Sequence, residues 1–130
     1  MSAGLLAFHH LSLSVTDLDR SVGWYQEVLG LLITAQVEGA GFRRTRMRSP
    51  SGGVTFTLTC HDERSGDRFD ERRTGMDHVS FRLAPEELSA WKGKLEKLGV
   101  AHSDVKSSSS DTAMITLRDP DNVQLELFFG

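Results

Sequence analysis

The amino-acid sequence predicts an α+β fold built from two related halves, each with one strand, one helix and three further strands. Three observations lead to this prediction. Apolar and polar residues alternate in several short segments, two other segments show the spacing of amphipathic helices, and the order of these segments occurs twice in the chain. A length of 130 residues fits a single globular domain, 1–130, with one core.

The predicted strands are segments in which every second residue is apolar, because side chains alternate between the two faces of a sheet. The clearest are 11–15, 54–60, 79–83, 113–117 and 123–127, and weaker patterns mark 33–37, 42–47 and 101–106. Each is expected to place one face on the core and the other toward solvent or a binding site.

Two segments place their apolar residues on one side of a helix. These residues are Leu18, Val22, Tyr25 and Leu29 in the first segment and Leu88, Trp91, Leu95 and Leu98 in the second. Thr16 and Asp17 are candidate caps for the first helix, and Pro85 precedes the second. Both patterns stop at a glycine, as helices that end in a left-handed residue do.

An internal repeat relates the two halves. "HLSLSV" from His10 resembles "HVSFRL" from His78 at an offset of 68 residues (78 − 10). "LGL" at Leu29 matches "LGV" at Leu98 at an offset of 69 (98 − 29), and a later match makes Thr57 and Glu126 equivalent. The sequence therefore predicts a first module, 7–60, a charged linker, 61–76, and a second module, 77–130.

Charge and composition argue against several classes of function. A net charge of -3 and a pI near 5.9 do not fit a nucleic-acid partner, which usually requires a basic face. No apolar run is long enough for a membrane span, and the first seven residues lack the features of a secretory signal, so a cytoplasmic protein is expected. Because Cys60 is the single cysteine, nitrogen and oxygen must supply the ligands of any metal.

If both helices cover one side of a curved sheet, the strand faces on the other side are polar and form a concave site. Three of the four positions related by the repeat hold His10, His78 and Glu126, and Thr57 is the fourth. Two imidazoles and one carboxylate suit Fe, Mn, Zn, Ni or Co as a divalent ion and leave coordination positions open for water and substrate.

Each of these residues also has an ordinary explanation, because single histidines and glutamates are common on the solvent side of a sheet. Their equivalent positions in the two halves favour a shared metal site, in which Glu126 is also the candidate catalytic residue. Other polar residues on the same faces are expected to contact substrate or orient the ligands; they are Ser12, Thr57, Ser80 and Arg82.

Two further motifs leave alternatives open. Arg43, Arg44, Arg46 and Arg48 could clamp an anionic substrate, or they could keep an edge strand soluble, which is the more common role. The serine run 107–110 is typical of a flexible loop, and a loop beside a pocket could also act as a lid.

Three stretches resemble the vicinal oxygen chelate superfamily, the group of glyoxalase I, fosfomycin-resistance thiol transferases, extradiol dioxygenases and bleomycin-resistance proteins. They are "HHLSLSVTDLDRSVGWYQEVLGL", "GMDHVSFRL" and "RDPDNVQLELFF", and the resemblance runs from Phe8 to Phe129. It implies two βαβββ modules forming a curved mixed sheet in the shape of a cup, a homodimer, and a divalent metal bound by His10, His78 and Glu126.

The sequence also departs from particular members of this superfamily. Thr57 stands where glyoxalase I and the epimerases carry a fourth ligand or base, which argues against a glyoxalase-type proton transfer. The fosfomycin enzymes share two histidines and one glutamate, and Lys106 with the serine run falls near their cation and phosphonate loop. Their chains continue to a substrate-binding arginine, whereas this chain stops at Gly130.

The leading functional expectation is a metal-dependent lyase, dioxygenase or thiol transferase whose small oxygenated substrate chelates the ion through two oxygens. The alternative is a metal-free binding protein of the bleomycin-resistance type that sequesters an antibiotic or aromatic metabolite. In that case Met114, Phe128 and the tryptophans would matter more than the three candidate ligands. The metal site could form within one chain or across a dimer.

Overall fold

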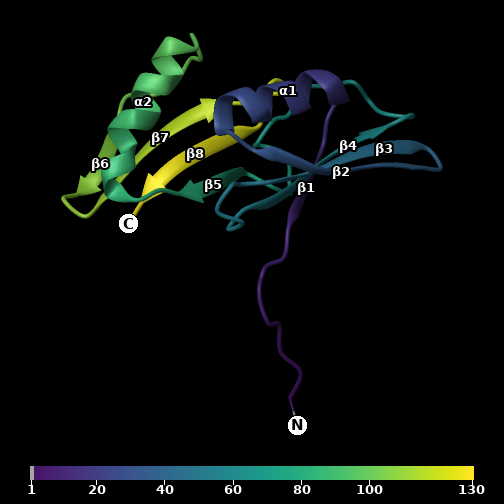
Figure 1. The fold of residues 1–130 in the computed structure, drawn as a ribbon, viewed down its shortest axis with the longest axis horizontal. Helices are drawn as coiled ribbons and strands as arrows, with labels where there is room; N and C mark the ends of the chain where they lie inside the picture. The colour runs from purple at the N-terminus through teal and green to yellow at the C-terminus, as the bar shows by residue number, and fades with distance from the viewer. Residues whose placement is uncertain (1) are drawn as a thin grey trace. The chain divides into compact units, whose positions relative to one another are not determined.

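The computed structural model describes residues 2–130 and divides into two compact units, one ending at Gly66 and the other beginning at Asp67. The first unit contains β1 (Leu11–Ser14), α1 (Leu18–Leu29), β2 (Leu32–Gly39), β3 (Phe42–Arg48) and β4 (Thr55–His61). The second contains β5 (His78–Arg82), a 3-10 turn η1 (Pro85–Glu87), α2 (Leu88–Lys97), β6 (Lys106–Ser109), β7 (Thr112–Arg118) and β8 (Gln124–Phe129). The predicted α+β class and the strand–helix–three-strand order of each half are confirmed (Figure 1).

Each unit forms one mixed four-stranded sheet, and the two sheets have equivalent topologies. The strand orders are β1-β4-β3-β2 and β5-β8-β7-β6. In each sheet the first and last strands of the unit pair in parallel, and the remaining neighbours are antiparallel. The repeat seen in the sequence is therefore a repeat of topology.

The helix α1 packs on one face of the first sheet. Its N-cap Asp17 accepts a hydrogen bond from the backbone N–H of Arg20 at 3.0 Å, and the left-handed Gly30 (φ 71°) ends it, as the sequence predicts. Tyr25 is fully buried, with its ring centroid 5.2 Å from that of Phe56 on β4. This contact assigns the apolar side of the sheet to the helix and leaves the opposite side of each strand for other roles.

The second unit has the same arrangement with a smaller helix core. Leu95 of α2 is fully buried, and so are Ile115 and Leu125 on β7 and β8. The opposite strand faces carry the side chains that the sequence assigns to a site. Neither helix among residues 2–130 has the length and apolar character that a membrane crossing requires.

The structure corrects the prediction for the segment before β7. We expect a strand over 101–106 and a loop over 107–110, but only His102 forms an isolated bridge, to Leu117, and β6 covers Lys106–Ser109. Ser107 donates a hydrogen bond to the carbonyl oxygen of Thr112 at 2.7 Å. The composition of this polar segment favours a loop, but pairing with β7 makes it the edge strand of the second sheet.

Part of the predicted linker docks on the second unit. The backbone N–H of Phe69 donates to the carbonyl oxygen of Asp121 at 2.9 Å, and Asn122 donates back to the Phe69 carbonyl oxygen at 3.0 Å. The side chain of Asp119 accepts hydrogen bonds from the backbone of Asp121 and Val123, which fixes the turn between β7 and β8.

Candidate metal centre

Two of the three predicted ligands lie next to each other in the second unit. The strands β5 and β8 pair in parallel with Ser80 opposite Glu126, so His78 lies one pleat earlier on the same face. Its Nε2 atom is 3.5 Å from Oε1 of Glu126. Two ligand atoms at 2.0–2.2 Å from one ion stand roughly 3 Å apart, so this spacing fits two ligands of a single metal.

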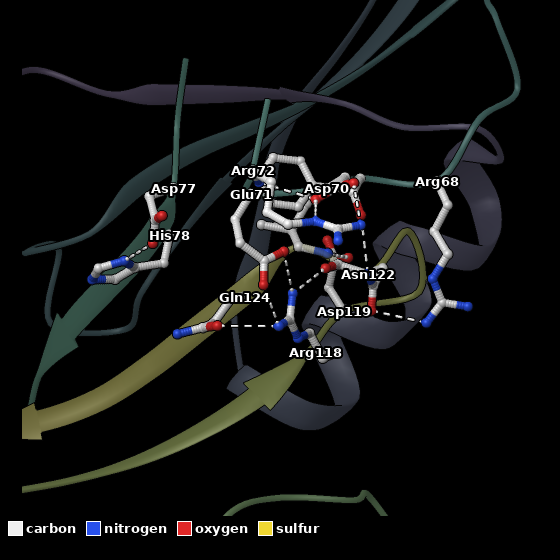
Figure 2. Close-up of polar contacts among 12 residues, drawn as sticks. Arg68, Asp70, Glu71, Arg72, Asp77, His78, Arg118, Asp119, Asn122 and Gln124 are labelled. Atoms are coloured by element: carbon white, nitrogen blue, oxygen red, sulfur yellow. Dashed lines mark hydrogen bonds and ion pairs between the residues drawn. The ribbon is translucent and has the colours of Figure 1, made fainter. Parts of the chain in front are cut away.

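A second carboxylate fixes the orientation of the His78 ring. The Oδ1 atom of Asp77 lies 2.7 Å from Nδ1 of His78, and Figure 2 shows this contact at the start of β5. An ionised carboxylate only accepts, so Nδ1 donates to Asp77, and Nε2 is the ring nitrogen on the side of Glu126. Metal-binding histidines are commonly held in this way.

Asp77 is a residue that the sequence analysis missed. Its signal is the acid directly before the candidate histidine in "MDHVS". An acid next to a histidine in sequence is common, and only the side-chain geometry shows that the two are bonded.

The third predicted ligand, His10, belongs to the first unit. It is exposed and precedes β1 by one residue, and its Nδ1 atom lies 2.7 Å from Nδ1 of His9. One of these nitrogens must donate, and the contact leaves Nε2 of His10 for another partner. Within either unit, the described residues 2–130 hold no group of three or more His, Cys, Asp or Glu side chains suited to a metal.

The four predicted substrate residues lie on two sheets. Ser80 is opposite Glu126, and Arg82 is one pleat further along β5, opposite Phe128; both Ser80 and Arg82 are exposed. In the first unit Ser12 is opposite Thr57. Ser80 is therefore the one that the structure places beside a candidate ligand.

Thr57 is buried without a hydrogen-bond partner. Its side chain is 4% exposed, and Oγ1 has no partner among the described residues. An unsatisfied buried hydroxyl costs about 1–3 kcal/mol of stability. The neutral hydroxyl also occupies the position equivalent to Glu126, and it cannot act as a carboxylate ligand.

Glu71, in the linker segment, forms an ion pair with Arg118, the cationic side chain that lies closest to His78 in the register of the second sheet. Arg118 and His78 both lie opposite Gln124, and Arg118 donates two hydrogen bonds to Glu71, at 2.7 and 3.1 Å (Figure 2). Those bonds hold the pKa of Glu71 at about 2, below its ordinary 4.5. This pairing reduces the repulsion that a free Arg118 would exert on a cation bound at His78.

The depressed pKa of Glu71 predicts a pH-dependent contribution to stability. The unfolded chain binds a proton at Glu71 near pH 4.5 and the folded chain only near pH 2. The contribution is therefore complete above pH 4.5 and is lost as the pH falls toward 2. We expect Glu71→Gln to melt below wild type at pH 7 and the difference to vanish near pH 2, measured by thermal unfolding. A difference independent of pH would contradict the ion pair, and Glu63→Gln, an exposed acid in the first unit, is the control.

Comparisons with known proteins cover almost the whole chain. A model of the Glyoxalase/Bleomycin resistance protein/Dioxygenase superfamily matches residues 7–127. The chain belongs to this superfamily. It is 29% identical to the glutathione transferase FosA of Serratia marcescens over 133 aligned positions, covering 97% of this chain and 82% of FosA.

Two further relatives extend this relationship. The metallothiol transferase FosB of Bacillus licheniformis is 28% identical and covers 97% of this chain, which in turn covers 77% of FosB. The crystal structure of a glyoxylase/bleomycin resistance protein/dioxygenase domain from Frankia sp. EAN1pec superposes with a TM-score of 0.88 at 32% identity, covering 98% of this chain and 99% of that one. The predicted superfamily and fold are thereby confirmed.

Proposed function

We propose that this superfamily member is a metal-dependent enzyme, and that His10, His78 and Glu126 hold its divalent ion. The observation that carries the proposal is the approach of His78 Nε2 to Glu126 Oε1 at 3.5 Å, with Asp77 bonded to the other ring nitrogen. Nitrogen and carboxylate donors suit Mn, Fe, Co, Ni or Zn. Such an ion, when bound, polarises a substrate oxygen.

The neighbouring residues of the second unit have roles in this proposal. Glu126, with its side chain 14% exposed, is a ligand whose second oxygen can accept a proton from substrate or water. Ser80 lies opposite it and can donate a hydrogen bond to a substrate oxygen. Arg82, further along β5, can contact a more distant part of the substrate.

Thiol transfer to a small oxygenated substrate is the reaction class that we favour. FosA and FosB are named as thiol-using transferases, and each aligns with 97% of this chain. A hydroxyl at Thr57 in place of a carboxylate removes the second base that a proton shuttle would need. The reaction of a thiol nucleophile needs no second protein carboxylate.

We also propose a homodimer in the cytoplasm. Leu5, Leu6 and Phe8 are at least 83% exposed in the segment before β1, and exposed apolar groups of this kind are typical of protein interfaces. Cys60, a buried free thiol, fits a reducing compartment. In such a dimer the partner copy can supply the third ligand, His10.

Metal analysis tests the proposed enzyme. Protein purified without an affinity tag is expected to contain about one divalent ion per chain, since the three ligands form one site. A metal-free protein that gains no stability from Mn²⁺, Co²⁺, Ni²⁺ or Zn²⁺ would contradict the proposal. Tight binding of an aromatic ligand by such a protein would favour the sequestering alternative.

Mixing two inactive variants tells whether the site crosses a dimer. His10→Ala and His78→Ala chains are each expected to lack the metal. If the ligands come from two copies, unfolding and refolding the variants together restores one complete site per mixed dimer, because each chain supplies what the other lacks. If one chain supplies all three ligands, the mixture stays metal-free. Metal content of the refolded mixture distinguishes the two arrangements.

A further inference from the structure

Arginines and hydroxyls occupy the face of the first sheet opposite α1. By strand alternation and register, this face holds Arg44, Arg46 and Arg48 of β3, Thr55, Thr57 and Thr59 of β4, and Ser12 and Ser14 of β1. The only acid in these four strands is Glu38, which lies opposite Arg43 and so faces the α1 side. The face therefore carries positive charge without a carboxylate of its own strands.

These arginines do not serve to keep an exposed edge strand soluble. The strand β3 lies inside the sheet, hydrogen-bonded to β2 on one side and β4 on the other, so the expectation of an edge strand is wrong. Among residues 2–130, Arg44 and Arg46 form no ion pair with a carboxylate. Two neighbouring guanidinium groups thus lack a counter-ion on a strand that needs no protection from edge pairing.

One of the two guanidinium groups is held in place. The Nε atom of Arg44 donates to Oγ1 of Thr59 at 2.8 Å, and its Cζ atom lies 4.6 Å from the ring centroid of Phe42. Ser12 Oγ is 2.9 Å from the same Thr59 oxygen. These contacts fix the side chain through Nε and leave its two terminal nitrogens for a ligand.

The unsatisfied hydroxyl of Thr57 lies in the next row of the same face. The register places Thr57 between Ser12 on β1 and Arg46 on β3. Its Oγ1 is buried with no partner among the described residues, whereas the Thr59 hydroxyl beside it has two. A buried donor without an acceptor, beside unpaired cations, points to a missing anionic acceptor.

We propose that Arg44, Arg46 and Thr57 form an oxyanion site that binds the phosphonate, phosphate or carboxylate group of a small organic ligand. The donors come from two adjacent strands, which suits an anion with several oxygens. Ser12, at the edge of the site, is two residues from His10, a candidate metal ligand on the same chain segment. Identifying the ligand as the substrate rests on the proposed function; the anion site itself does not.

Anion binding to the metal-free full-length chain tests the site. Calorimetry with methylphosphonate, inorganic phosphate and acetate is expected to show binding, and the comparison of methylphosphonate with acetate identifies the preferred group. Arg44→Gln and Arg46→Gln should each weaken binding by about tenfold or more, since each removes a charged hydrogen-bond donor. The matched control is Arg43→Gln, the same charge change on the opposite face of β3, expected to stay within about twofold. An equal loss in the control, or no binding by wild type, would overturn the proposal.

Thr57→Val separates ligand binding from folding. Valine replaces the hydroxyl with a methyl group of similar shape, so the melting temperature should hold or rise while methylphosphonate affinity falls several-fold. A lower melting temperature with unchanged affinity would assign the hydroxyl a structural role and remove it from the site. His78→Ala, in the second unit, should keep the anion affinity while losing metal. A wild-type chain that binds metal but no anion would overturn this inference alone, and a wild-type chain that binds the anion but no metal would overturn the proposed enzyme alone.

Discussion

His78→Ala is expected to remove the metal ion, reducing the metal content from about one ion per chain to nearly none. In the proposed site the variant loses one of three ligands, and with it the contact between Asp77 and the His78 ring. Loss of an outer partner of a ligand costs 10–100-fold in metal affinity, so loss of the ligand itself should exceed about 100-fold. Metal analysis after dialysis, followed by titration with Mn²⁺ and Zn²⁺, measures the effect.

His61→Ala is the matched control for this experiment. His61 is exposed at the end of β4, and we assign it no ligand role. With metal removed from all three proteins, both variants should unfold within about 0.5 kcal/mol of wild type, because the His78 and His61 side chains lie at the surface. If His78→Ala kept the metal with wild-type affinity, the assignment of β5 and β8 as the metal-binding strands would be wrong.

The fold could be predicted because its two halves repeat the same local signals. The serines of β1 alternate with Leu11 and Leu13, and α1 begins at an Asp17 cap and ends at a left-handed Gly30. These signals depend on neighbours in the sequence, and they agree with the tertiary packing. The match of His10 with His78 then placed β1 and β5 at the same point of each module.

Signals that depend on distant pairing were not available from the sequence. The serine run became β6 through hydrogen bonds to Thr112 and pairing with β7. The arginine-rich strand β3 became an internal strand because β2 covers its outer side. The composition of a segment indicates how polar it is and whether it can be exposed to solvent, but it does not identify the strand that pairs with it.

The residues of the candidate site also fall into those that the sequence predicts and those that only the structure reveals. The repeat singled out His78 and Glu126, which the structure brings together, and Thr57, which it leaves buried and unsatisfied. Asp77 could be recognised only from its distance to the ring. The participation of His10 stays a prediction.

The two modules share a topology but differ in what their equivalent positions can do. Glu126 offers a carboxylate beside a histidine, whereas Thr57 offers a neutral hydroxyl beside Arg46. One sheet therefore has donors for a cation and the other has donors for an anion.

Asp77→Asn should weaken metal binding by about tenfold, and Asp77→Ala by up to about 100-fold. The Oδ1 atom of asparagine can still accept a hydrogen bond from Nδ1–H of His78, but asparagine lacks the charge that makes Nε2 a stronger donor to the metal. Alanine removes the acceptor as well. The Asp77 side chain is 65% exposed, so neither change should alter the melting temperature of the metal-free protein appreciably. Asp111→Asn, an exposed acid in the same unit, controls for the change of net charge. If metal titration gave Asp77→Ala the same metal affinity as Asp111→Asn, the Asp77–His78 contact would be only a surface hydrogen bond. A metal affinity that falls stepwise from aspartate to asparagine to alanine is expected only if the carboxylate acts on the metal through the imidazole.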